Sequence, residues 1–172
     1  MPPMIYPEFR QVPLRAGEPG GLWLHHMPGR HETMASILAQ LDALRITTVV
    51  CLTPHDEIRE KSPEYATALA AGVPWEQVFF PVRDFGIPED PDTLYRLAES
   101  LATRLRAGAR VLVHCGAGIG RTGTFACVLL MALGYSHEQS LSAVEEAHAG
   151  PETSAQEQIV VAYRARRGGL AP

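Results

Sequence analysis

The chain has 172 residues, of which 46% are hydrophobic and 20% charged, the composition of a soluble globular protein. A chain of this length buries about 70% of the surface that its unfolded form exposes, so it can fold as one domain without disulfide or metal staples. Fifteen basic and nineteen acidic residues give a formal net charge of −4, which argues against general affinity for nucleic acid or an anionic membrane. Any bound anion is therefore expected to be held locally.

The sequence contains no targeting or metal signature. No segment approaches the roughly 20 apolar residues of a membrane span, and the N-terminal residues lack the apolar stretch of a secretory signal, so a cytoplasmic location is expected. Cys51, Cys115 and Cys127 are an odd number without zinc-like spacing, which favours neither a disulfide framework nor a metal site. We predict no metal and no cofactor, and a monomer is favoured. The histidines are expected at surface or helix-cap positions: His25, His26, His31, His55, His137 and His148.

Strands and helices alternate along the chain. Residues 1–20 are rich in proline and lack periodicity, which predicts an extended N-terminal arm, and residues 168–172 are expected to be a flexible tail. Between them, residues 21–167 are expected to form one globular domain. Strands are predicted at 21–25, 46–52, 78–82 and 111–114. Helices are predicted at 31–44, 63–71, 92–107, 122–133, 137–148 and 154–166.

This alternation, without internal repeats, indicates an α/β fold: a single domain with a central, mostly parallel sheet of four to five strands and helices on both faces. Sites in such sheets form at the carboxyl ends of strands. The strand at 111–114 leads directly into the glycine-rich segment HCGAGIGRTG, and so the functional site is expected there.

The segment HCGAGIGRTG combines a cysteine, an arginine and three intervening glycines. Glycines let backbone N–H groups turn into one concavity, and the following helix adds the positive end of its dipole. Arg121 offers a planar fork of donors that matches two phosphoryl oxygens, and the same donors stabilise a thiolate at Cys115. Thiolate attack on phosphorus gives a cysteinyl-phosphate intermediate without a metal. The predicted phosphate loop consists of Gly116, Ala117, Gly118, Ile119, Gly120 and Arg121.

The segment resembles the signature of the cysteine-dependent protein tyrosine phosphatase superfamily, which is His-Cys, five residues, Arg and then Ser or Thr. The resemblance implies the protein tyrosine phosphatase fold for residues 21–167, which would then be a phosphatase domain. It also implies the hydrolysis of phosphate monoesters, with phosphotyrosine in proteins as the first expected substrate. It also implies that Thr122 hydrogen-bonds the cysteine sulfur and that His114 supports the loop. Chain length and the segment TPHDEI are most similar to the compact cyclin-dependent-kinase-associated and cell-division-cycle-type dual-specificity branch. The phosphate loop is more similar to tyrosine-specific enzymes, so phosphoserine and phosphothreonine stay open.

A general acid must protonate the leaving oxygen, and the segment VRDFGIPE is similar to the acid loop of tyrosine phosphatases. Asp84 falls on its acid, although Val-Arg replaces the usual Trp-Pro pair before it. An aspartate that caps a turn beside Gly86 is the structural alternative. Asp90 or Asp92 would then be the acid, but both are typical of helix starts.

The segment ETSAQEQ is similar to the superfamily's glutamine loop, which positions the hydrolytic water. Gln156 falls on the second glutamine of that loop, while Glu152 occupies the first. Helix-start chemistry from Thr153 or Ser154 explains the segment equally well.

Two further segments have alternative interpretations. Cys51 closes the strand at 46–52, where some superfamily members hold a reversible disulfide partner, but a buried free cysteine is also a common small apolar residue. Cys127, on the apolar helix, is expected in the core. The residues His55–Glu57 are interpreted as a solvated helix start, or as a segment that reaches the site and interacts with Arg121.

Two other functions compete with this interpretation. Inositol and phosphoinositide phosphatases usually carry lysines between the cysteine and the arginine, and this loop has none. A catalytically silent phosphoresidue-binding module typically loses the cysteine, the arginine or the acid, whereas Cys115, Arg121 and Asp84 are all present. The sequence therefore favours a metal-independent phosphatase whose partner is a phosphoprotein or phosphopeptide.

Overall fold

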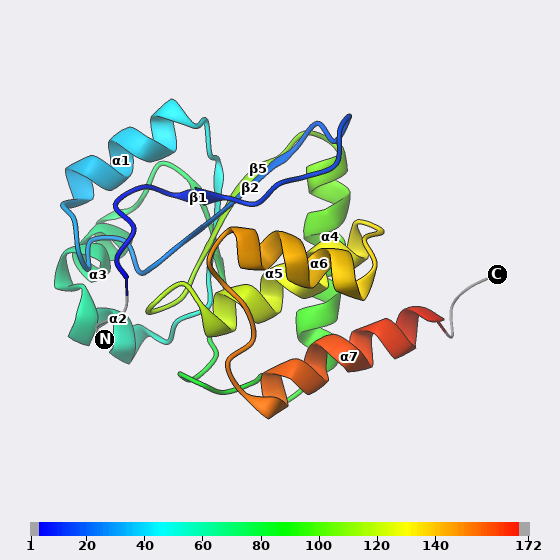
Figure 1. Ribbon diagram of the computed structural model, residues 1–172. Helices are drawn as coiled ribbons and strands as arrows, with labels where there is room; N and C mark the ends of the chain where they lie inside the picture. The colour runs from blue at the N-terminus through cyan, green and yellow to red at the C-terminus, as the bar shows by residue number, and fades with distance from the viewer. Residues whose placement is uncertain (1–3, 169–172) are drawn as a thin grey trace.

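A five-stranded sheet with the order β1-β2-β5-β3-β4 forms the centre of the computed structural model, which describes residues 4–168 (Figure 1). The short β1 (Arg10–Gln11) lies at one edge and pairs antiparallel with β2. The other four strands are parallel: β2 (Gly21–His25), β3 (Thr48–Cys51), β4 (Glu76–Phe79) and β5 (Arg110–His114). The predicted α/β fold with a mostly parallel sheet is confirmed.

Seven helices connect and cover the strands within the described range. They are α1 (Met34–Ala43), α2 (His55–Lys61), α3 (Pro63–Ala71), α4 (Pro91–Arg106), α5 (Gly120–Ala132), α6 (His137–Glu146) and α7 (Ser154–Gly168). None of them is both long and apolar enough to cross a membrane. Helix α1 begins three residues later than predicted, because Thr33 caps it by accepting a hydrogen bond from the backbone N–H of Ser36.

The third predicted strand is displaced in the structure. β4 spans Glu76–Phe79, whereas the sequence placed a strand at 78–82. Backbone N–H groups of Phe80 and Val82 nevertheless donate to the carbonyls of Cys51 and Leu52, so the chain stays hydrogen-bonded beside β3 after the regular strand ends. This contact delivers the following segment, residues 83–90, to the carboxyl edge of the sheet.

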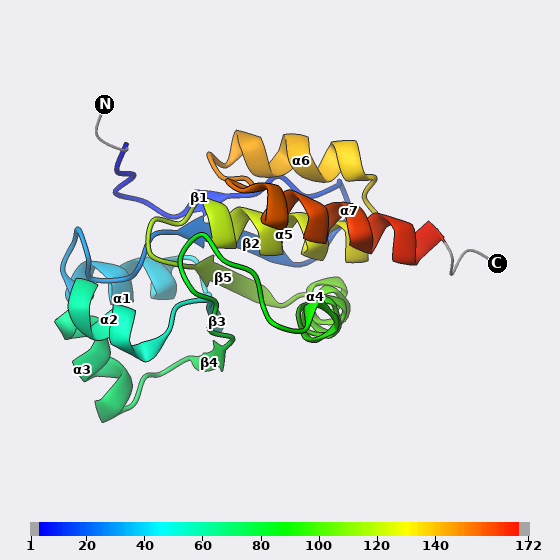
Figure 2. The same ribbon diagram turned by 90° about the horizontal axis from the view of Figure 1, so that it is seen from below.

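Two hydrophobic cores lie on opposite faces of the sheet, as the period-2 alternation of strand side chains requires. Helices α1, α2 and α3 lie on one side, and α4, α5, α6 and α7 lie on the other (Figure 2). In β5, for example, Val111 and Val113 face the second group, whereas Leu112 faces the first. The predicted helices on both faces are confirmed.

Helix α5 is buried over twelve of its thirteen residues, from Gly120 to Met131, because α4, α6 and α7 pack around it. A helix that is apolar on all sides is typical of such a central position. Since α5 begins within the glycine-rich segment, this packing fixes the position of one end of that loop. Cys127 is fully buried in this helix, as predicted.

The two ends of the chain compare differently with the prediction. Within the predicted N-terminal arm, Arg10 and Gln11 form the edge strand β1, and the Val12 N–H continues the pairing with Leu22. At the other end, Gly168 still belongs to α7, and residues 169–172 of the predicted tail lie outside the described residues.

The first turn of α5 packs against backbone at Gly123, where an added methyl group would overlap the backbone nitrogen of Gly150. We expect Gly123→Ala to lower the free energy of unfolding by about 1–3 kcal/mol, because this overpacking outweighs the helix preference of alanine. Urea denaturation followed by circular dichroism measures the change. The control is Gly150→Ala, whose methyl group would enter open space; an equal loss in both variants would contradict the packing explanation.

Candidate active site

Cys115 follows β5 directly, in the middle of the sheet and at its carboxyl edge. Its side chain is buried, and the backbone N–H of Gly118 donates to Sγ over 3.3 Å. Gly118 has a φ of +74°, a conformation that favours glycine, so this residue lets the chain curl back toward the sulfur. The thiol therefore lies inside the bend between β5 and α5.

Three donors hold the outer side of this bend. The carbonyl of Gly116 accepts hydrogen bonds from the Met27 N–H (3.2 Å) and from Nη1 of Arg30 (2.9 Å). The carbonyl of Gly118 accepts from Nη2 of Arg10 over 2.7 Å. In a planar trans peptide, the next N–H points away from the preceding carbonyl, so these contacts direct the N–H groups after Gly116 and Gly118 to the opposite side. Such oriented amides form an anion-binding concavity.

Arg121 lies in the first turn of α5 and is almost completely buried. Its Nη1 and Nη2 donate to the two carboxylate oxygens of Glu57 at 2.8 Å each, and Nη1 also donates to the carbonyl of Val82 at 2.8 Å. Burial opposes the charge of this guanidinium, but the Glu57 carboxylate outweighs burial and raises the pKa of Arg121. Nε is buried without a hydrogen-bond partner among residues 4–168, so a phosphoryl oxygen would satisfy it.

Glu57 links Arg121 to Lys61, four residues later on α2, whose Nζ lies 2.8 Å from the Glu57 carboxylate. Burial alone would raise the pKa of Glu57, but hydrogen bonds from Arg121 and Lys61 lower it to about 2. Residues 55–57 therefore begin a helix, α2, as one interpretation expected, and they also reach the site through Glu57, as the other expected. Asp56 instead pairs with Arg83 on the surface.

Asp84 lies beside the guanidinium, with Oδ1 3.2 Å from Nη2 of Arg121 and Oδ2 3.9 Å from Nζ of Lys61. Its side chain is half-exposed, so it stands at the rim of the site. The alternative acids are elsewhere. Asp90 caps α4, and Asp92 pairs with Arg166 at 2.6 Å, as expected for helix-start residues.

Gln156 lies buried in the first turn of α7 and contacts the segment that carries Asp84. Its Nε2 donates to the carbonyl of Gly86 over 3.2 Å, and its Oε1 accepts from the N–H of Glu152 over 2.8 Å. Helix-start chemistry is present as well, because the Thr153 hydroxyl accepts from the Gln156 N–H. The structure therefore brings Gln156 to the predicted acid loop.

Two predicted supporting residues differ in their contacts. His114 lies behind the loop, where Nε2 is 2.9 Å from the Tyr65 hydroxyl and Nδ1 is 3.3 Å from the Cys115 carbonyl. Complete burial lowers the pKa of His114 to about 3, so the ring is neutral. The Thr122 hydroxyl is buried without a hydrogen-bond partner among the described residues, so its expected bond to Cys115 Sγ is not formed.

The other two cysteines lie outside the bend. Cys51 is opposite His114 in the sheet register, and its thiol donates to the Thr53 carbonyl over 3.6 Å. Burial raises the pKa of both Cys51 and Cys127 to about 12, so neither is a thiolate at neutral pH. All three cysteines are free thiols, and the redox pairing of Cys51 with Cys115 stays a prediction.

The prediction of surface or cap positions is wrong for His25 and His26, which are buried. Both lie at the carboxyl end of β2, which the turn before α1 covers, and their rings face Glu32. His31 and His55 are exposed as expected.

Sequence reasoning also missed Lys61, Arg10 and Arg30. The spacing of Glu57 and Lys61 at i and i+4 on one helix was the signal available for the lysine. No comparable local pattern marks the two arginines.

The fold and this strand–loop–helix site define a cysteine-based phosphatase of the protein tyrosine and dual-specificity type. The family described as "Swiss Army Knife protein, DSP-PTPase phosphatase domain" matches residues 19–171, and the chain belongs to this family.

Solved structures of similar fold cover nearly the whole chain. Kinase associated phosphatase, with its catalytic-site cysteine replaced by serine, has a TM-score of 0.78 at 20% identity, over 98% of this chain and 98% of that chain. Tk-PTP in its active form has a TM-score of 0.68 at 23% identity, over 94% of this chain and 99% of that chain. A variant of human DUSP28 has a TM-score of 0.70 at 20% identity, over 96% of this chain and 100% of that chain. At these identities the likeness shows the fold.

The pairing of Glu57 predicts a specific acid sensitivity. A carboxyl whose pKa is lowered from 4.5 to about 2 in the folded protein stabilises the fold above pH 4.5 and loses this contribution as the pH falls toward about 2. Glu57→Gln removes the charge, so the difference in unfolding free energy between the two proteins should shrink across this interval.

Urea titrations at several pH values measure that difference. Glu60→Gln, an exposed residue of the same helix, is the matched control and should follow the unmodified protein. A constant difference between the unmodified protein and Glu57→Gln from pH 5 to about pH 2 would show that the ion pair does not couple to folding.

Proposed function

We propose that the chain hydrolyses phosphate monoesters, phosphotyrosine in proteins first, through a cysteinyl-phosphate intermediate on Cys115. The observation that carries the proposal is the convergence of the Cys115 thiol, inward-facing loop amides and the unpartnered Nε of buried Arg121 in one bend. A tetrahedral dianion supplies the acceptors that these donors require. A cytoplasmic location and a monomeric state, expected from the sequence, belong to the same proposal.

In the first step, the Cys115 thiolate attacks phosphorus in line with the leaving oxygen. The S–P bond forms, the P–O bond breaks, and the alkoxide or phenoxide takes a proton from the Asp84 carboxyl. The loop amides and Arg121 hold the three non-bridging oxygens, where charge is greatest in the transition state. Gly116 to Gly120 bind through backbone, so the loop needs no polar side chain between Cys115 and Arg121.

In the second step, water attacks the cysteinyl phosphate, and the Asp84 carboxylate accepts its proton. The S–P bond breaks, sulfur leaves as a thiolate, and inorganic phosphate is released. Gln156 is assigned to water positioning because it contacts the acid loop at Gly86. The unpartnered hydroxyl of Thr122, next to Arg121, is assigned to the stabilisation of the departing thiolate.

Substrate binding is expected to change the partner of Asp84. Without substrate, its carboxylate contacts Nη2 of Arg121. A phosphoryl dianion competes for that guanidinium and repels the carboxylate, so Asp84 should move away from Arg121 and toward the leaving oxygen. Glu57 keeps its two hydrogen bonds to Arg121 throughout and holds the fork in place.

Charge around the site favours a single phosphate. The only lysine of the chain, Lys61, is already paired with Glu57, and the loop itself adds no cation before Arg121. Next to Asp84, the side chain of Phe85 is 60% exposed and Ile87 is exposed too, which provides apolar surface for a phenyl ring. A phosphoinositide is the second candidate, since a structural neighbour, PTPMT1, was solved in complex with PI(5)P.

The nucleophile and the substrate class are tested together with the purified protein. We expect turnover of p-nitrophenyl phosphate in excess EDTA and no turnover by Cys115→Ser. On a panel of matched phosphopeptides and a monophosphorylated inositol lipid, kcat/KM should be highest for phosphotyrosine. Activity that persists in Cys115→Ser would overturn the mechanism, and a preference for the lipid would replace the proposed substrate.

The assignment of Asp84 is tested by leaving-group dependence. Asp84→Ala should lower kcat about 100-fold for phosphotyrosine and less for p-nitrophenyl phosphate, because a good leaving group needs less protonation. Affinity for a phosphotyrosine peptide should be retained. Asp90→Asn and Asp92→Asn are the matched controls and should keep near-normal rates; a 100-fold loss in either would move the acid to that residue.

A further inference from the structure

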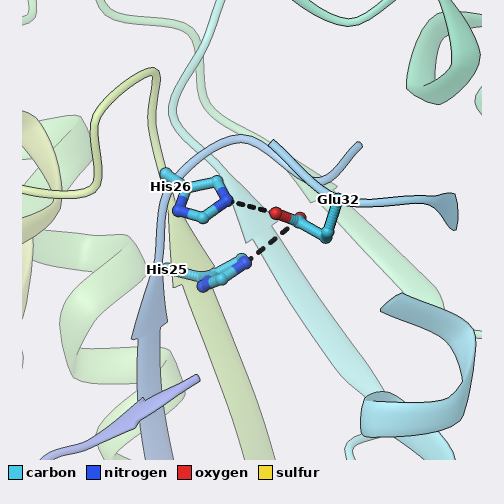
Figure 3. A group of neighbouring side chains, drawn as sticks. All are labelled: His25, His26 and Glu32. Carbon is cyan, nitrogen blue, oxygen red and sulfur yellow. Dashed lines mark hydrogen bonds and ion pairs between the residues drawn. The ribbon is translucent and has the colours of Figure 1, made fainter. Parts of the chain in front are cut away.

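A group of three buried or half-buried ligand-type side chains lies one strand away from the phosphate loop. His25 is the last residue of β2, His26 follows it, and Glu32 lies in the turn before α1 (Figure 3). Nε2 of His25 is 3.3 Å from Oε1 of Glu32, and Nε2 of His26 is 2.5 Å from Oε2. One ligand atom from each residue can be chosen so that all lie within 4.8 Å of one another.

We propose that His25, His26 and Glu32 bind one divalent transition-metal ion of the zinc class, through the two imidazoles and the carboxylate. Two histidines and one carboxylate are a ligand set for such ions, with exchangeable water in the remaining position. Zinc-to-nitrogen distances of about 2.0–2.1 Å in tetrahedral geometry place donor atoms about 3.3 Å apart. Small side-chain shifts convert the hydrogen-bonded triad into a ligating one once each imidazole carries its proton on Nδ1, which leaves Nε2 free to bind the ion.

Burial separates the three side chains from bulk water except at one edge. His25 is fully buried, while the Glu32 side chain is 12% exposed, which leaves an edge through which an ion can enter.

The surroundings indicate a site of moderate affinity. The backbone N–H of Gly29 donates to Oε1 of Glu32 over 3.2 Å and orients the carboxylate. Nδ1 of His25, by contrast, is buried without a partner in the described part of the chain, so this ligand lacks the outer hydrogen bond that tightens metal sites 10–100-fold, in order of magnitude. The positive charge of Arg10 also acts on His25. Micromolar rather than nanomolar binding is expected.

An ion bound by His25, His26 and Glu32 would affect the neighbouring phosphate loop. His25 pairs with His114 in the sheet, and its carbonyl is packed closely against Gly118 of the phosphate loop. The same turn that carries Glu32 also carries Met27 and Arg30, whose donors hold the Gly116 carbonyl. A bound ion would fasten this turn to β2 and thereby hold the outer side of the loop. It takes no part in the phosphoryl transfer.

Direct metal binding tests the proposal independently of phosphatase activity. The Cys115→Ser protein, which lacks the catalytic thiol as a competing ligand, is stripped with chelator and titrated with Co²⁺ and Zn²⁺. We expect one ion per chain and a cobalt spectrum without sulfur-to-metal charge transfer. His26→Gln and Glu32→Gln in this background should weaken binding at least about tenfold, while His137→Gln, on α6, should not.

A second measurement leaves the triad intact and so does not depend on the folding of a variant. In nitrogen-15 spectra of the imidazoles, addition of Zn²⁺ should shift the Nε2 resonances of His25 and His26 and leave those of His55, His137 and His148 in place. No binding at hundred-micromolar zinc, equal affinity in Glu32→Gln and His137→Gln, or shifts confined to other histidines would overturn the site.

Discussion

The orientation of two peptide groups in the bend after β5 is the constraint on which the site depends. The carbonyls of Gly116 and Gly118 must face outward so that the following N–H groups face the proposed phosphate position, and donors from outside the loop enforce this. Arg10 comes from the edge strand β1, whereas Met27 and Arg30 come from the turn after β2. The N-terminal arm is therefore part of the active-site scaffold, although it contributes no group to the chemistry.

Arg121, like the loop peptides, is held in its orientation by groups from outside the loop. A long side chain loses about 1.5–2 kcal/mol of rotamer freedom when it is fixed, and Glu57 and the Val82 carbonyl impose this cost during folding rather than during substrate binding. The bidentate carboxylate takes one N–H of Nη1 and one of Nη2, so Nε and the N–H of Nη2 that contacts Asp84 are the donors left for the proposed phosphate. Lys61 offsets part of the negative charge of Glu57, so the dianion meets a site that is not dominated by its carboxylates.

Local sequence patterns were enough to predict which side chains lie together when they belong to one contiguous segment. Residues 114–122 form one strand end, one glycine-rich bend and one helix start, so the pattern placed Cys115 and Arg121 in the same bend, and the segment around Asp84 lies beside it. Such patterns failed where side chains from distant segments meet. His25 and His26 were expected at the surface, because the turn that covers them has no periodic hydrophobic pattern from which its position could be predicted. The hydrogen-bond partners of Arg10 and Arg30 lie over 85 residues away in the sequence. The contact between the Thr122 hydroxyl and Cys115 Sγ is not formed in this structure, because a side-chain rotamer depends on packing and not on a motif.

In the proposed mechanism, Asp84 and the phosphoryl group share one partner. Asp84 contacts Nη2 of Arg121, which Glu57 also contacts, and an incoming phosphoryl group would compete for the same nitrogen. Glu57 is bound by both Arg121 and Lys61, whereas Asp84 is half-exposed and lies on a loop. We therefore expect an incoming phosphoryl group to displace Asp84, and not Glu57, from the guanidinium. Gln156 limits how far Asp84 moves, since its amide stays attached to Gly86, two residues beyond the acid.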